Sequence, residues 1–367
     1  MKIARKHIIT SPSLWLRTAL AVLCVLAMLA SCDVHEFPPL STTAPAVLHL
    51  RFTTDLPQYD YYVTRAAETR EGVHVANTPV RTEGLMRYVV RFYPKGTEDK
   101  GDAVADFKEY TFTRNLADGY DADFTCDVPP GDYTVKVWAD MSSNALSSLN
   151  FYNTSNFYDV CLNTPHCGNT DYRDAFAGTT TLSLAVSEDE TQAAEATVEM
   201  ERPLAKFEFV SNDLQLFIHQ QLQSLSQKAA AAAGTTPEAS DTRTLSLSAY
   251  RIVFYYNGYM PSSYNLFTDK PVDAVTGVSF KGDISQLSDD EASLGFDYVF
   301  VNHKATEVTV QLAIYDVSGA LISTCAPVNV PLQRSRHTIV RGAFLTQKAT
   351  GGVNVNPAYD DEYNIRF

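Results

Sequence analysis

The sequence predicts an all-β protein made of two β-sandwiches, for three reasons. First, apolar and polar residues alternate with a period of two along most of the chain, as in strands that bury one face. Second, Tyr (20) and Phe (19) far outnumber Met (6) and Trp (2), and aromatic residues are enriched in strands. Third, turn residues separate many short apolar runs, without the regular alternation of strands and helices that a doubly wound nucleotide-binding fold requires.

The first half of the chain contains the clearest strand pattern. In residues 48–52, Leu48, Leu50 and Phe52 share one face of the predicted strand. Pro129–Asp132 predicts a turn that leads directly into another strand. The strands predicted in this half cover residues 48–52, 86–93, 110–112, 124–126, 133–138, 181–186 and 196–200.

The second half repeats the strand pattern and adds one helix. Asn212 or Asp213 is the predicted N-cap of a helix over 214–233, and Gly234 is its predicted stop. We interpret its apolar stripe as a surface packed on a sheet, with docking into a partner as the alternative; the stripe holds Leu214, Phe217, Ile218, Leu222 and Leu225. The strands predicted here cover residues 206–210, 247–256, 296–301, 307–315, 321–325, 337–345 and 362–367, with a hairpin turn at 316–319.

Residues 1–31 predict a lipoprotein signal peptide. Basic residues precede an apolar run, Ala19–Ala30, that is shorter than the roughly 20 residues a membrane-spanning helix needs. The run ends in Leu29-Ala30-Ser31-Cys32, which has the pattern of a lipobox, in which the Cys32 thiol takes the lipid, such as palmitate. An ordinary secretory signal with a chance cysteine is the alternative. The sequence therefore predicts an outer-membrane protein held at the cell surface by a lipid anchor, with residues 32–45 as the lipidated N-terminus and stalk.

The charge balance limits the partners. With 43 acidic and 29 basic side chains the net charge is −14, and nucleic-acid binding depends on an excess of Lys and Arg. The sequence therefore argues against nucleic acid as a partner.

Four cysteines remain once Cys24 leaves with the signal peptide and Cys32 takes the lipid. Cys161 and Cys167 lie in one Asn-rich loop, for which a local disulfide, two free thiols and a metal site that would also use His166 are the alternatives. Their spacing matches no recognised zinc pattern. Cys126 and Cys325 lie inside strand-like runs and are predicted to be buried single thiols.

Two predicted loops, 63–84 and 141–174, are longer than most loops in compact domains, and loops of this length usually have a function or serve as linkers. The first contains three arginines, Arg65, Arg70 and Arg81. The second mixes amides with aromatic rings, a composition that suits sugars, which stack on rings and hydrogen-bond to amides. Its candidate ligand-binding residues are Tyr152, Asn153, Asn156 and Tyr158. Irregular packing across the sandwich is the alternative interpretation of this loop.

Recognisable catalytic chemistry is absent from the sequence. It has no nucleophile elbow, no phosphate-binding loop and no metalloprotease motif, so we expect no enzyme activity, no cofactor and no metal. Two acidic clusters do not have the spacing of a known calcium loop and are best explained as solvated turns; they are Asp118, Asp121 and Asp123, and Asp360, Asp361 and Glu362.

Several segments resemble surface lipoproteins of Bacteroidales that form a family of unassigned function. The matching segments are 32–38, 54–57, 130–140, 174–178, 200–206 and 351–357. The chain is more distantly similar to the fimbrial subunit and anchor lipoproteins of the same bacteria, which implies two transthyretin-like β-sandwich domains. The segment 201–206 resembles the start of the second domain of those proteins. The resemblance thus implies an N-terminal domain over 46–200 and a C-terminal domain over 201–367. Because the second half contains its own predicted strands, helix and turns, we expect it to fold alone from about Arg202.

Two functions follow from these patterns. One is a non-catalytic cell-envelope lipoprotein that serves as a fimbria-like structural, anchor or adhesion component and contacts other fimbria-like subunits. Its predicted donor strand for a neighbouring subunit carries Tyr363, Ile365 and Phe367 on one face. The alternative is a surface lipoprotein that binds host or dietary glycans through the 141–174 loop.

Overall fold

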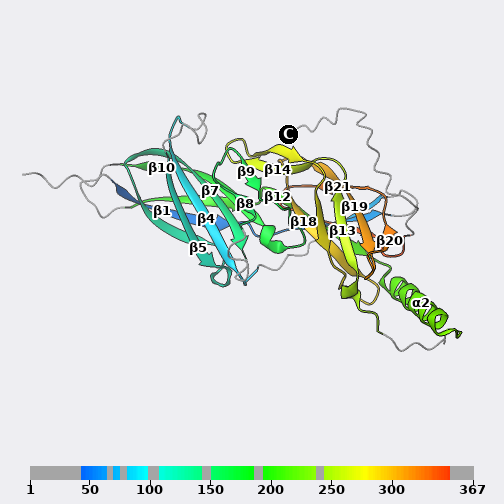
Figure 1. Ribbon diagram of the computed structural model, residues 1–367. Helices are drawn as coiled ribbons and strands as arrows, with labels where there is room; N and C mark the ends of the chain where they lie inside the picture. The colour runs from blue at the N-terminus through cyan, green and yellow to red at the C-terminus, as the bar shows by residue number, and fades with distance from the viewer. Residues whose placement is uncertain are drawn as a thin grey trace, which may run out of the picture. The chain divides into compact units, whose positions relative to one another are not determined.

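The computed structural model describes residues 43–347, apart from 64–68, 75–80, 98–106, 143–149, 186–192 and 237–243. The predicted all-β fold is confirmed: strands arranged in four sheets make up most of the described chain, with one α-helix (Figure 1). No helix among the described residues is long and apolar enough to cross a membrane.

The first sheet contains seven strands and encloses the first core. Their order is β5 (Lys108–Asn115), β4 (Leu85–Pro94), β7 (Gly131–Ser142), β10 (Ala175–Leu184), β11 (Ala194–Glu201), β1 (Ala44–Phe52) and β6 (Ala122–Val128). The two edge strands, β5 and β6, are connected by a short 3-10 turn, Leu116–Asp118, and contact each other through side chains. Phe112 stacks on Phe124 with 4.5 Å between ring centroids. The sheet therefore curls around a core that includes Leu48, Tyr88 and Val137.

Two further sheets pack face to face in the second half. One has the order β17 (Ser285–Gln286), β18 (Ala292–Phe300), β12 (Leu204–Ser211), β22 (His337–Gly342), β2 (Gln58–Val63) and β3 (Thr69–His74). The other has the order β16 (Ser279–Gly282), β13 (Arg251–Tyr256), β19 (Thr306–Tyr315) and β20 (Leu321–Thr324), with β21 (Val328–Leu332) also paired to β19. Phe207, Phe254 and Leu312 share the core between them, as alternating inward side chains do in a sandwich.

The fourth sheet joins the two halves of the chain. Its order is β15 (Lys270–Val275), β14 (Met260–Asn265), β9 (Val160–Leu162) and β8 (Tyr152–Asn153). A third core lies here, where Trp138 of the first sheet packs with Tyr264 and Phe300 of the second half. Phe151, Tyr152 and Phe157 of the 141–174 segment are therefore packed in this core.

The predicted helix is confirmed at both ends as α2 (Leu214–Ala233), with Asp213 as N-cap and Gly234 in the left-handed conformation at φ 66°. The Asp213 carboxylate makes no bond to the helix; it accepts hydrogen bonds from the backbone N of Leu345 and Thr346 instead. Only the first turns of the predicted stripe pack against the body. Phe217 is fully buried, whereas Leu225 is 41% exposed.

Three sequence expectations need correction. Residues 247–249 form a 3-10 turn, and the strand predicted there begins only at Arg251. The segment 63–84 is not one long loop, because β3 lies within it and pairs with β2. The strand predicted at 181–186 begins at Ala175. The first of these segments carries Ser and Ala, which suit turns as well as strands. Strand β3 forms through pairing with β2, the strand just before it, and β10 starts at Ala175 because it pairs with β7 from there to Leu184.

The chain passes from the first sheet to the second between Glu201 and Leu204, where the domain boundary is predicted. However, β2 of the first half pairs with β22, and β9 pairs with β14. Residues Ala44–Phe367 cluster as one compact unit. The division into two domains therefore stays a prediction.

Candidate functional site

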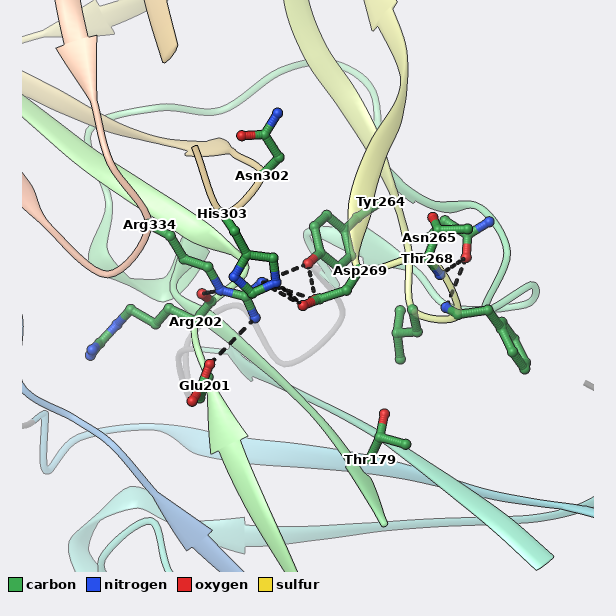
Figure 2. Close-up of polar contacts among 12 residues, drawn as sticks. Thr179, Glu201, Arg202, Tyr264, Asn265, Thr268, Asp269, Asn302, His303 and Arg334 are labelled. Carbon is green, nitrogen blue, oxygen red and sulfur yellow. Dashed lines mark hydrogen bonds and ion pairs between the residues drawn. The ribbon is translucent and has the colours of Figure 1, made fainter. Parts of the chain in front are cut away.

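Three turns of the second half bring charged side chains together beside the end of β11 (Figure 2). Asp269 comes from the turn between β14 and β15, His303 from the segment after β18, and Arg334 from the turn between β21 and β22. Glu201 ends β11. We call these four side chains, together with Tyr264 of β14, the Asp269 cluster.

The turn that carries Asp269 is held by side-chain capping. Asn265 Oδ1 accepts hydrogen bonds from the backbone N of Phe267, at 2.8 Å, and of Thr268, at 3.0 Å. Asp269 itself has φ 55°, a left-handed conformation that Asp tolerates better than most residues. The local sequence thus fixes the direction of the Asp269 carboxylate.

Arg334 is the buried cation of the cluster, with a side chain 10% exposed. Its Nη1 donates to both carboxylate oxygens of Asp269 at 2.9 Å, and its Nε donates to the Arg202 carbonyl at 2.8 Å. Tyr264 donates its hydroxyl to Asp269, and the His303 Nε2 pairs with the same carboxylate. The Nη2 of Arg334 lies 3.8 Å from Glu201.

These contacts set the charge of the cluster. Burial acts to raise the pKa of Asp269, but the hydrogen bond from Tyr264 and the positive charge of Arg334 outweigh it, so the pKa lies below its usual range. Burial raises the pKa of Tyr264. At neutral pH the cluster therefore presents an ionised carboxylate beside a phenol that remains protonated.

The exposed part of the cluster can hydrogen-bond to a polar ligand. The side chains of His303, Glu201 and Asp269 are 60%, 57% and 41% exposed. Carboxylates accept hydrogen bonds and an imidazole can donate or accept one, so the arrangement suits hydroxyl-rich molecules. Within the described ranges no group of three or more His, Cys, Asp or Glu residues could hold a metal ion.

The predicted ligand-binding residues of the 141–174 loop have different surroundings. Tyr152 is 1% exposed and donates its hydroxyl to the Arg173 carbonyl. Asn153 and Asn156 accept hydrogen bonds from backbone N atoms two residues further on. Tyr158 stacks on Phe267 with 4.0 Å between ring centroids. The loop thus brings Tyr158 beside the turn that carries Asp269, and places the Tyr152 ring in the core.

The cysteines of the described chain are all free thiols. Cys161 is half-buried on β9 and Cys167 is exposed, and the two thiols are not bonded to each other in this structure. Their disulfide stays a prediction. Cys126 and Cys325 are buried, as predicted, and burial raises the pKa of the Cys126 thiol to about 12 and that of Cys325 to about 11.

Other predicted sites fall in two groups. Cys32 and the donor-strand residues Tyr363, Ile365 and Phe367 lie outside the described residues, as does the acidic cluster 360–362. In the first acidic cluster, Asp121 accepts a hydrogen bond from the backbone N of Phe52, and Asp123 pairs with Arg51 at 2.9 Å. Both carboxylates therefore have partners on β1.

Sequence reasoning missed a buried carboxylate that ties the two halves together. Asp297 of β18 accepts hydrogen bonds from Arg173 Nη1 and His166 Nε2 at 2.7 Å, and from the Tyr256 hydroxyl at 2.7 Å. Burial acts to raise the pKa of Asp297, but the charges of Arg173 and His166 lower it below its usual range. Arg173 lies 124 positions away in the sequence, so no local pattern could have revealed the pair.

Comparison with known proteins gives one family and several similar folds. The model of a family of unknown function (DUF6562) matches residues 41–367. The fimbrial anchor protein Mfa2 from Porphyromonas gingivalis is similar with a TM-score of 0.35 and 12% identity, over 77% of this chain and 82% of that chain. The tip fimbrial protein Mfa3 of the same organism, with a C-terminal truncation, has a TM-score of 0.35 and 12% identity, over 82% of this chain and 94% of that one. No curated protein matches the chain.

Proposed function

Because the chain belongs to this family of unknown function, we propose its role from its own residues: it is a non-catalytic lipoprotein of the cell envelope. Anchored in the outer membrane through Cys32, it serves at the cell surface as a fimbria-like structural, anchor or adhesion component. The predicted membership of a family of unassigned function is confirmed.

The observation that carries the proposal is the short distance in sequence between the lipobox and the folded body. Strand β1 begins at Ala44, only twelve positions after Cys32. At a maximum of about 3.5 Å per residue, this span reaches at most about 40 Å. A lipid on Cys32 would therefore hold the sheets close to the membrane. Any force on the lipid anchor would reach the folded part of the chain at β1.

The anchor is tested by the substitution Cys32→Ala. We expect the variant to lack lipid and to leave the membrane fraction, because the remaining chain has no other predicted membrane attachment. Fractionation and metabolic labelling with a palmitate analogue provide the measurement, and Cys24→Ala is the matched control. A Cys32→Ala protein that stays fully in the membrane fraction would exclude this anchor. Proteolysis of intact cells, read by mass spectrometry, then tests surface exposure.

Glycan binding is the second candidate, and the Asp269 cluster favours it. The cluster offers exposed hydrogen-bonding groups two residues from Phe267, whose ring stacks on Tyr158 of the 141–174 loop. Aromatic rings beside oriented carboxylates suit sugar rings and their hydroxyls. Tyr152 is buried, so in this candidate it supports the loop.

Arrays of host and dietary glycans test the second candidate. Asp269→Asn should weaken binding about tenfold, since a hydrogen bond to a charged group contributes about 1.5–3 kcal/mol. Asp273→Asn is the matched control, because this exposed carboxylate on β15 lies outside the cluster, and among the described residues it accepts a hydrogen bond from the backbone N of Ala274 alone. Equal binding by both variants, or no glycan bound by the wild type, would exclude the cluster as a sugar site.

A further inference from the structure

The first described strands of the chain lie inside two different sheets. Strand β1 is flanked by β11, parallel to it from Ala46 to Phe52, and by β6, antiparallel to it from Ala44 to Leu50. Strand β2 is flanked in the same way by β22, parallel, and by β3, antiparallel. Neither strand is at an edge, so both are hydrogen-bonded on two sides.

The link between the two strands is tightly held. The backbone N of Thr53 donates to the Met200 carbonyl at 3.1 Å, and the backbone N of His337 donates to the Pro57 carbonyl at 2.9 Å. Leu56 is 1% exposed. Arg202, itself paired with Asp174 at 2.8 Å, donates from Nη1 to the Asp55 carbonyl at 3.0 Å. Residues 44–63 therefore cross from one sheet to the other with both ends of the link bonded in place.

The direction of the neighbouring strands determines how a pull on the N-terminus is resisted. Strand β11 runs parallel to β1 and continues after Glu201, through two residues, into β12 of the second half. A force that pulls Ala44 away from the second half therefore acts along the axis of β1. It acts against β11, whose C-terminal end is held by its connection to β12. Ladder hydrogen bonds lie across the strand direction, so such a load strains them together rather than one after another.

We propose that residues 44–63 form a load-bearing strap that carries force from the membrane tether into both sheets. The strap rests on the proposed lipid anchor, because only a tether at Cys32 makes Ala44 the point where load enters. Its mechanical resistance, however, is a property of β1, β2 and their partners, and it can be measured without the lipid.

The test pulls single molecules of the chain from residue 33 onward in two geometries. In the first, peptide-ligase handles sit at the N-terminus and at Val317, which is 78% exposed in the turn between β19 and β20. In the second, the N-terminal handle moves to Asp118, in the exposed turn between the edge strands β5 and β6, each paired on one side only. The strap requires a higher first rupture force in the N-terminal geometry. An equal or lower force there would overturn it.

Two matched proline variants separate the strap from general stability. Val47→Pro removes a donor of the β1–β11 ladder. Arg114→Pro removes one from the edge strand β5, because Leu116 donates to the Gly84 carbonyl and the Arg114–Met86 pair is the next hydrogen-bonded pair along the ladder. Val47→Pro should lower the rupture force more in the N-terminal geometry than in the Asp118 geometry, and Arg114→Pro should do the reverse. Equal losses in both geometries would contradict the strap. The handles replace the lipid in this experiment, so that outcome does not bear on the proposed lipid anchor. Conversely, a Cys32→Ala protein that stays in the membrane fraction excludes the anchor but does not change the rupture forces.

Discussion

At the scale of single residues, Asp297 shows why buried charge links distant segments. Its carboxylate is fully buried, and its partners Arg173 and His166 come from the segment just before β10. A buried charge that loses its partner raises the free energy of the folded state. The Asp297 contacts therefore stabilise the fold only while β18 and the segment before β10 stay together. Sequence reasoning identified His166 only as a potential metal ligand, because the carboxylate that it contacts lies 131 positions away.

The first residue-scale prediction concerns Asp297→Asn. Breaking a buried ion pair costs about 3–5 kcal/mol, so we expect a loss of this order in the free energy of unfolding at pH 7, measured by urea denaturation. The matched control is Asp123→Asn, since Asp123 is 62% exposed in its pair with Arg51; there we expect little change. Equal effects of the two variants would show that the Asp297 contacts do not stabilise the fold.

The pH dependence of Asp297 has a definite sign. Because the folded-state pKa is lowered, the stabilisation is fully present above the unfolded value of about 3.9 and is lost as the pH falls through the folded pKa. The wild type should therefore lose stability below about pH 4 more steeply than Asp297→Asn. Urea denaturation across this acid range provides the measurement, and parallel curves for the two proteins would contradict the assignment.

At the scale of elements, local patterns were sufficient where an element depends on its own residues. The helix α2 has the predicted ends because Asp213 and Gly234 mark them in the sequence. The pairing of β2 with β22 could not be predicted, because it joins Asp60 to Ile339 across most of the chain. The Asp269 cluster was missed for the same reason, since Asp269, His303 and Arg334 come from three separate turns that only the fold brings together.

Helix α2 leads to the prediction at this scale. Phe217 is fully buried and packs against Tyr250 with 5.1 Å between ring centroids. Phe217→Ala should therefore cost about 3–5 kcal/mol in the free energy of unfolding. Leu225→Gln, on the exposed part of the same helix, should change it by no more than about 0.5 kcal/mol. A large loss for Leu225→Gln would mean that this part of the stripe is also packed on the body, as the sequence interpretation of the whole stripe expects.

At the scale of the whole molecule, the question is whether the halves fold separately. The predicted boundary near residue 200 coincides with the passage from β11 to β12. A fragment from Arg202 onward, however, would lose β2 from beside β22 and leave Asp297 without Arg173 and His166. Covering β22 and pairing Asp297 both require the first half, so the structure argues for one cooperative unit.

The fragment 202–367 provides a direct test of this view. Alone, we expect it to show no cooperative thermal transition by circular dichroism, because its exposed strand β22 and unpaired Asp297 both raise its free energy. Mixed with the fragment 32–201, it should recover a cooperative transition, since the missing strand β2 and the side chains of Arg173 and His166 return with its partner. The mixture of 32–201 with a 202–367 fragment carrying Asp297→Asn is the control and should recover less stability. A fragment 202–367 that melts cooperatively by itself would instead establish two independent domains with their boundary near residue 200, and the strap would then connect two separately stable bodies.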